Sequence, residues 1–129
     1  MTTPQNPDTA TSTSNQAVPG QSVAQQLVGD IAPKLAELTD DVLFGDIWAR
    51  PELAPRDRSL VTVASLVTGG NPDQLVGHLR RAKQNGVSES ELVEAIVHLA
   101  FYAGWPKAMS AITVAKRVFA EDRDATDPS

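Results

Sequence analysis

The sequence predicts an all-α fold of about six helices, because three observations agree on this class. Apolar residues recur at helical spacing through most of the chain, and no run alternates with the two-residue period of a strand. Glycine, proline and capping residues divide the apolar runs into helix-sized segments. At 129 residues the chain is long enough for one domain with a core, and too short to predict two.

Both ends of the chain are polar. Residues 1–21 are rich in Thr, Ser, Pro and Asn and have almost no large apolar side chains, which predicts a disordered tail. A second, shorter tail is expected over residues 123–129. The folded domain is therefore expected to cover residues 22–122, without an internal repeat.

The first helical pattern begins at Val23 and ends near Leu38. Pro33 interrupts it, and a proline inside a helix removes a hydrogen bond and clashes with the preceding turn. A kinked or broken helix is therefore predicted. A short second segment, over residues 40–48, brings several apolar side chains together before the turn at residues 50–51.

A helical hairpin over residues 55–85 is the predicted centre of the fold. Pro55 suits the first position of a helix, and the glycines at 69–70 suit its end. This helix is apolar on nearly all sides, as is typical of a helix in the middle of a bundle or between subunits. Asn71 and Pro72 then begin a second helix as N-cap and first residue, and the short connection makes the two helices antiparallel neighbours.

Two more helices complete the predicted bundle. The pair Asn85-Gly86 ends the hairpin, and Ser88 with Glu91 has the spacing of a capping box. The helix that follows is again apolar over a wide arc, and the last helix is expected over residues 106–120. The helix that begins at the capping box and the first helix of the hairpin together have more apolar surface than a domain of this size can bury in its interior. A homo-oligomer that buries the excess is therefore expected.

Composition excludes several classes of function. The chain has no cysteine, which removes disulfides, thiolate metal sites and a cysteine nucleophile. A net charge of −5 and a pI near 4.8 argue against nucleic acid as a partner. Arg80, Arg81 and Lys83 lie close together and are interpreted as a solvated helix face. No apolar run approaches the length of a membrane span and no signal peptide is recognisable, so a cytoplasmic protein without membrane contact is expected.

No cofactor or metal is expected. The glycines at 69–70 lack the lysine and the spacing of a phosphate-binding loop. His78 and His98 are far apart in sequence and lack the paired acidic residues that a metal site would add.

Six short motifs follow one another in order along the chain, and together they resemble the carboxymuconolactone decarboxylase family from about Leu43 to Phe119. They are FGDIWARP at 44–51, RDRSLVTVA at 56–64, HLRRA at 78–82, NGVS at 85–88, ELVE at 91–94 and YAGWP at 102–106. The resemblance implies an all-helical, alkylhydroperoxidase D-like protein that assembles as a trimer or hexamer, with active sites near subunit boundaries. The activity it implies is cofactor-free decarboxylation of 4-carboxymuconolactone, a carboxylated lactone of aromatic compound catabolism.

The same superfold includes thiol peroxidases with a Cys-x-x-Cys-x-x-x-His motif and an upstream glutamate. On that motif His78 matches the histidine, while Asn71 and Gln74 fall at the two cysteine positions and Ser59 at the glutamate position. A thiol peroxidase activity is therefore excluded, and the histidine position is retained.

The chemistry of decarboxylation suits the retained residues. Loss of CO2 from a lactone acid requires a cation to hold a carboxylate and a group that delivers a proton near neutral pH. His78 is the candidate general acid/base, and Arg58 is the candidate carboxylate ligand, with Arg56 expected in solvent. The alternatives are a structural histidine bonded to a backbone carbonyl, and a salt bridge from Arg58 to Glu94 or Asp57.

Five other residues are candidates for the site. Glu94 is a third catalytic candidate that would orient His78 or anchor an arginine, and if buried it must be paired or protonated. His98 and Tyr102 share a helix face, as a polar strip on the pocket wall or as a structural pair at an interface. Trp48 and Trp105 either cover an apolar pocket or act as packing anchors.

Two further functions remain open from the sequence. One is a lyase or isomerase that acts on a different small acid in specialised metabolism through the same His78 site. The other is a non-catalytic oligomeric binding protein that keeps the scaffold, since the apolar helix surface is wide and ionisable residues are sparse.

Overall fold

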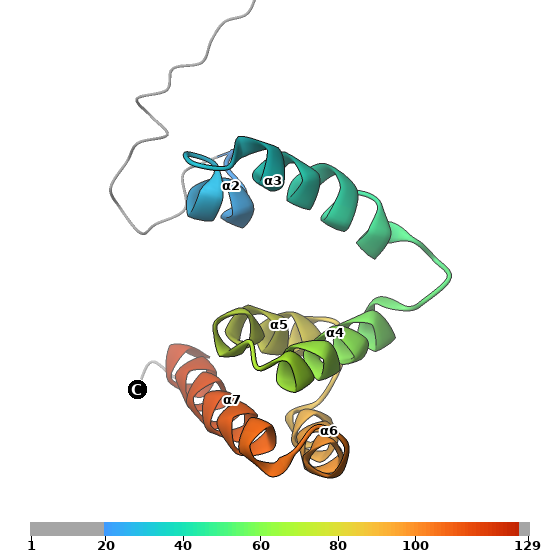
Figure 1. Cartoon of the computed structure of the whole chain (residues 1–129), viewed down its shortest axis with the longest axis vertical. Helices are drawn as coiled ribbons and strands as arrows, with labels where there is room; N and C mark the ends of the chain where they lie inside the picture. Colours follow the sequence, from blue (N-terminus) through green and yellow to red (C-terminus); the bar gives the residue numbers. More distant parts are fainter. Residues whose placement is uncertain (1–19, 127–129) are drawn as a thin grey trace, which may run out of the picture. The chain divides into compact units, whose positions relative to one another are not determined.

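The computed structural model describes residues 20–126, and all of their regular structure is helical, which confirms the all-α class (Figure 1). The predicted N-terminal tail lies outside the described residues except for Gly20 and Gln21. The chain divides between Arg50 and Pro51 into two compact units, and the folded domain over 22–122 stays a prediction. The division follows the packing, because the second unit draws its core from its own helices, α4 to α7.

The N-terminal unit contains two short α-helices, α2 (Val23–Val28) and α3 (Pro33–Leu38). The chain breaks before Pro33, which takes the first position of α3, so the predicted interruption is confirmed. Ser22 caps α2 by accepting a hydrogen bond from the Gln25 N–H at 3.0 Å. After α3 the backbone continues as a π-helix (Thr39–Phe44) and a 3₁₀ turn (Ile47–Ala49).

This unit buries little of its apolar surface. Among its described residues only Ala36 is fully buried. Its large aliphatic side chains are exposed at helical spacing, with Leu27 72% and Ile31 83% exposed. The exposed set is Val23, Leu27, Ile31, Leu35, Leu38, Val42, Leu43 and Ile47. A short helical unit with this surface needs a further apolar partner to be stable.

The C-terminal unit begins with the predicted hairpin, α4 (Pro55–Gly69) and α5 (Pro72–Gln84), whose helices are neighbours (Figure 1). Gly70 ends α4 with φ +69°, a left-handed conformation that glycine adopts without strain. Asn71 holds the N-cap position of α5, but its side chain makes no capping bond. Its backbone N–H donates to the Leu66 carbonyl at 3.0 Å instead, which closes the turn.

The last two helices are α6 (Glu89–Tyr102) and α7 (Trp105–Thr126). The predicted capping box opens α6: the Glu91 N–H donates to Ser88 Oγ at 3.0 Å, and the Ser88 N–H donates to Glu91 Oε1 at 2.9 Å. Helix α7 is longer than predicted. It continues through residues 121–126, beyond the predicted end at Ala120 and into the predicted C-terminal tail.

Ion pairs explain the additional turns of α7. Arg80 on α5 contacts Asp122 at 2.9 Å and Glu121 at 2.9 Å. Lys83 contacts Asp122 at 3.3 Å and Glu89, at the start of α6, at 2.6 Å. Two of the three basic residues interpreted as a solvated face therefore bind carboxylates of the same chain, and they hold the end of α7 against α5.

The core of this unit is formed by one stripe from each helix. Its largest fully buried apolar side chains are Val63 and Val67 on α4, Leu75 and Leu79 on α5, Leu92 and Ile96 on α6, and Val118 on α7. The opposite side of α4 is open, since Val61 is 61% exposed. Within the described range of the chain, no helix is long and apolar enough to cross a membrane.

Candidate active site

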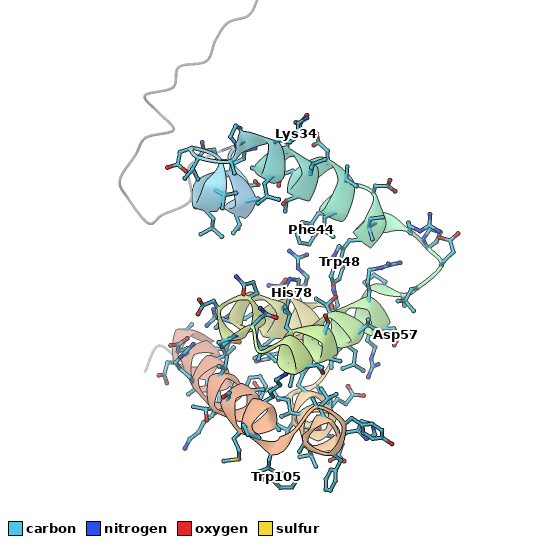
Figure 2. The ribbon with its side chains drawn as sticks, in the orientation of Figure 1. Lys34, Phe44, Trp48, Asp57, His78 and Trp105 are labelled. Atoms are coloured by element: carbon cyan, nitrogen blue, oxygen red, sulfur yellow. The ribbon has the colours of Figure 1, made fainter. Side chains whose placement is uncertain are left out.

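His78 lies on α5 beside the buried core and is itself half-buried (Figure 2). It is adjacent to Leu79 and one turn after Leu75, both fully buried, so one side of the helix carries the imidazole to the edge of the core. Burial, with a smaller contribution from the positive charge of Arg81, lowers the pKa of His78 below its ordinary value of 6.5. The imidazole is therefore mostly neutral at pH 7.

The two candidate arginines differ in environment. Arg58 is half-buried in the first turns of α4, with a buried Nε, and its Nη2 donates to the Leu53 carbonyl at 3.3 Å. Arg56, which the sequence places in solvent, forms an ion pair with Glu91 and a longer one with Asp57 at 3.5 Å. The guanidinium of Arg56 thus already binds carboxylates of its own chain.

Glu94 and His98 lie together in a groove of about 430 Å³ between α4 and α6. The groove has both apolar and charged lining residues: Arg56, Leu60, Ala64, Glu91, Glu94, Ala95, His98 and Leu99. Glu94 is exposed, so the argument that burial forces it to be paired does not apply. His78, Arg58 and Tyr102 are not in the lining of this groove.

Each aromatic candidate lies beside another ring of its own unit. His98 and Tyr102 stack with ring centroids 4.8 Å apart, which confirms that they share a face. Trp105 packs edge-on against Phe101 at 5.4 Å and is 58% exposed (Figure 2). Trp48 belongs to the N-terminal unit, where it is half-buried and lies 5.9 Å from Phe44.

A buried polar contact between α4 and α5 was not predicted. Ser59 is fully buried, and Asn85 Nδ2 donates to its hydroxyl at 2.9 Å. The signal was present in the sequence, because Ser59, Val63 and Val67 recur every four residues and so share the buried face of α4.

The described residues contain no group of three or more His, Asp or Glu side chains that could hold a metal ion. The candidate site offers a half-buried imidazole on α5 and a half-buried guanidinium on the neighbouring helix α4.

An all-helical unit with a histidine on the second helix of a central hairpin, and without thiols, defines the class of this protein as a cysteine-free, all-helical protein. The chain belongs to the carboxymuconolactone decarboxylase family, whose sequence model matches residues 33–117.

Two curated relatives match part of the chain. A 4-carboxymuconolactone decarboxylase of Acinetobacter baylyi is 45% identical over 76 residues, which is 59% of this chain. The nitrosuccinic acid decarboxylase npaB of Metarhizium robertsii is 36% identical over 81 residues, which is 63% of this chain. The match covers 57% of the length of each relative, so the chain spans little more than half of either protein.

Proposed function

We propose that this protein is a cofactor-independent decarboxylase of a small organic acid, with 4-carboxymuconolactone or a similar carboxylated lactone as its substrate. The observation that carries the proposal is the family membership, together with two relatives that are both named decarboxylases. The retained half-buried His78 supports it, because the reaction needs a proton carrier and the cysteine-dependent chemistry of the superfold is excluded.

The proposed reaction takes up one proton. The bond between the carboxylate and the ring breaks, CO2 leaves, and the electron pair passes toward the lactone carbonyl to give a dienolate. His78 then protonates the dienolate on carbon and recovers its proton from solvent. A partly buried imidazolium with a lowered pKa is a stronger acid than a free one, which favours this transfer.

Arg58 is the proposed ligand of the substrate carboxylate. A guanidinium binds a carboxylate through two parallel hydrogen bonds, and its charge is retained at any working pH. Arg56 already forms ion pairs with Glu91 and Asp57, so a substrate at Arg56 would have to displace these carboxylates.

The other predicted site residues of this unit, Glu94, His98, Tyr102 and Trp105, are exposed on α6 and at the start of α7. A substrate contact with them requires a neighbouring surface that closes the site. A homo-oligomer, as a trimer or hexamer, would supply this surface, and we propose it as the working form of the protein.

Two alternatives have specific support. The relative named nitrosuccinic acid decarboxylase favours a different small acid as substrate, with the same role for His78. The wide exposed apolar surface favours an oligomeric binding protein without catalysis.

The test is an assay of purified protein with 4-carboxymuconolactone that follows CO2 release, with the variants His78→Gln and His98→Gln alongside. We expect turnover in the wild type and in His98→Gln, and a loss of at least about a hundredfold in His78→Gln. If turnover is lost in His98→Gln but kept in His78→Gln, the proton carrier is His98, in the groove between α4 and α6. A folded wild-type protein without turnover on this lactone or on nitrosuccinic acid would favour the binding role.

A further inference from the structure

A buried hydrogen bond connects Ser59 on α4 with Asn85 at the end of α5. Ser59 is the one polar side chain that the described residues bury completely, with 0% exposure, and the residues that share its face of α4 are valines. An alanine would fill this position without a polar atom. A buried hydroxyl is costly unless it is hydrogen-bonded, and here Asn85 Nδ2 supplies the bond at 2.9 Å.

The Ser59–Asn85 hydrogen bond lies at the end of the hairpin that is opposite to the connecting turn. Helices α4 and α5 are connected covalently at one end by the tight turn at Gly70 and Asn71. Ser59 is near the start of α4 and Asn85 follows the last residue of α5, so their hydrogen bond joins the opposite, open end. The hairpin is therefore closed at both ends.

Apolar packing alone would leave the open end less defined. The contacts among Val63, Val67 and Leu79 are not directional, so they allow small sliding of one helix along the other. A hydrogen bond with fixed length and angle selects a single register. Asn85 is itself held, because its backbone N–H donates to the Arg81 and Ala82 carbonyls.

The residues of the proposed reaction lie on this hairpin. Arg58 directly precedes Ser59 on α4, and His78 lies about two turns before Asn85 on α5. We propose that the Ser59–Asn85 hydrogen bond is a positioning contact, which holds the first turns of α4 against the end of α5 and so fixes Arg58 relative to His78. Ser59 and Asn85 are positioning residues that act through Arg58, and this role rests on the proposed decarboxylase function.

The kinetic test uses Ser59→Ala, with Ser65→Ala as the matched control, because Ser65 is an exposed serine on the same helix. We expect KM to rise about tenfold in Ser59→Ala without a fall in kcat, since a ligand of the substrate carboxylate acts on the ground state and that carboxylate loses its charge as CO2 leaves. Ser65→Ala should match the wild type. Thermal unfolding and oligomer mass of each variant show that it is folded.

A double substitution separates positioning from simple destabilisation. If Ser59 acts through Arg58, Ser59→Ala should raise KM no further in a protein that already carries Arg58→Ala. If the effects of Ser59→Ala and Arg58→Ala on KM multiply in the double variant, the proposal is overturned. An unchanged KM in folded Ser59→Ala would overturn it too.

A spectroscopic measurement tests the contact independently of any substrate. The Nε of Arg58 is buried, so its proton should exchange slowly with solvent in the wild type. In arginine-labelled protein, with the Arg58 signal assigned by its loss in Arg58→Lys, we expect Ser59→Ala to shift this signal and to accelerate its exchange about tenfold. An unchanged Arg58 signal would overturn the proposal. If the wild type lacks decarboxylase activity but the signal responds, the positioning contact stands and only the proposed reaction fails.

Discussion

At the scale of single residues, the environment of His78 has a measurable consequence. Its pKa is lowered by burial and, to a smaller extent, by the charge of Arg81, so the charged form is scarce at neutral pH. The proposed proton transfer needs that charged form. The lowered pKa therefore makes the His78 imidazolium a stronger acid, but a smaller fraction of His78 is protonated at neutral pH.

This predicts the pH dependence of catalysis. As pH rises above the lowered pKa of His78, which lies below 6.5, kcat/KM should fall about tenfold per pH unit, because the free enzyme loses its proton donor. The measurement is kcat/KM between pH 5 and 8, with oligomer mass checked at each pH. A profile that instead rises with pH through this range would mean that neutral His78 acts, as a base, and would contradict the proposed direction of transfer.

The roles of some single residues could be predicted from the sequence, and those of others could not. The capping roles of Ser88 and Glu91 and the end of α4 at Gly70 were predictable, because they depend on residues within one turn. The pairing of Arg56 with Glu91 was not, because it joins residues from different helices. The same holds for Ser59 and Asn85, whose contact depends on how α4 packs against α5.

At the scale of helices, the ion pairs of Arg80 and Lys83 connect α5 with α6 and α7. Asp122 is central to this network. Hydrogen bonds from Arg80 and then Lys83 hold the pKa of the Asp122 carboxyl below its ordinary value. The carboxylate therefore stabilises the folded state at neutral pH, and this stabilisation is lost as pH falls through the lowered pKa.

Asp122→Asn tests the network. At pH 7 and low salt we expect the free energy of unfolding to fall by about 1 kcal/mol, because the pairs are partly exposed and individually weak. The difference from the wild type should shrink in 1 M salt and as pH falls below about 4. Denaturant melts measure it, with Asp124→Asn on the exposed side of α7 as the control. Equal effects of the two substitutions would show that the network does not hold α7.

At the scale of the whole molecule, both units expose apolar side chains. On the C-terminal unit they follow one side of α6 and continue onto α7: Val97 is 46% exposed, Phe101 74% and Met109 56%. Patches of this kind mark interfaces between proteins. They agree with the homo-oligomer that the apolar helices predict.

Phe101→Glu tests this surface. A charge in the centre of an apolar interface is not solvated there, so we expect the oligomer to dissociate toward the mass of one chain, 13.7 kDa. Size-exclusion chromatography with light scattering measures the mass. Ser90→Glu places the same charge on an exposed position of α6 and should leave the oligomer intact. A wild-type protein that is monomeric, or a Phe101→Glu variant with unchanged mass, would contradict the expectation.

The sequence by itself determined the all-α class, the break before Pro33 and the limits of the central hairpin, because proline, glycine and capping residues act on their own turn of backbone. The resemblance to the family, whose sequence model matches residues 33–117, also made His78 the candidate proton carrier, and this role stays a prediction. Only the tertiary structure decided the length of α7, the division after Arg50, the open groove that holds Glu94 and His98, and the contact between Ser59 and Asn85. The physical reason is range: caps and breaks are local, whereas ion pairs, buried hydrogen bonds and grooves depend on which helices meet.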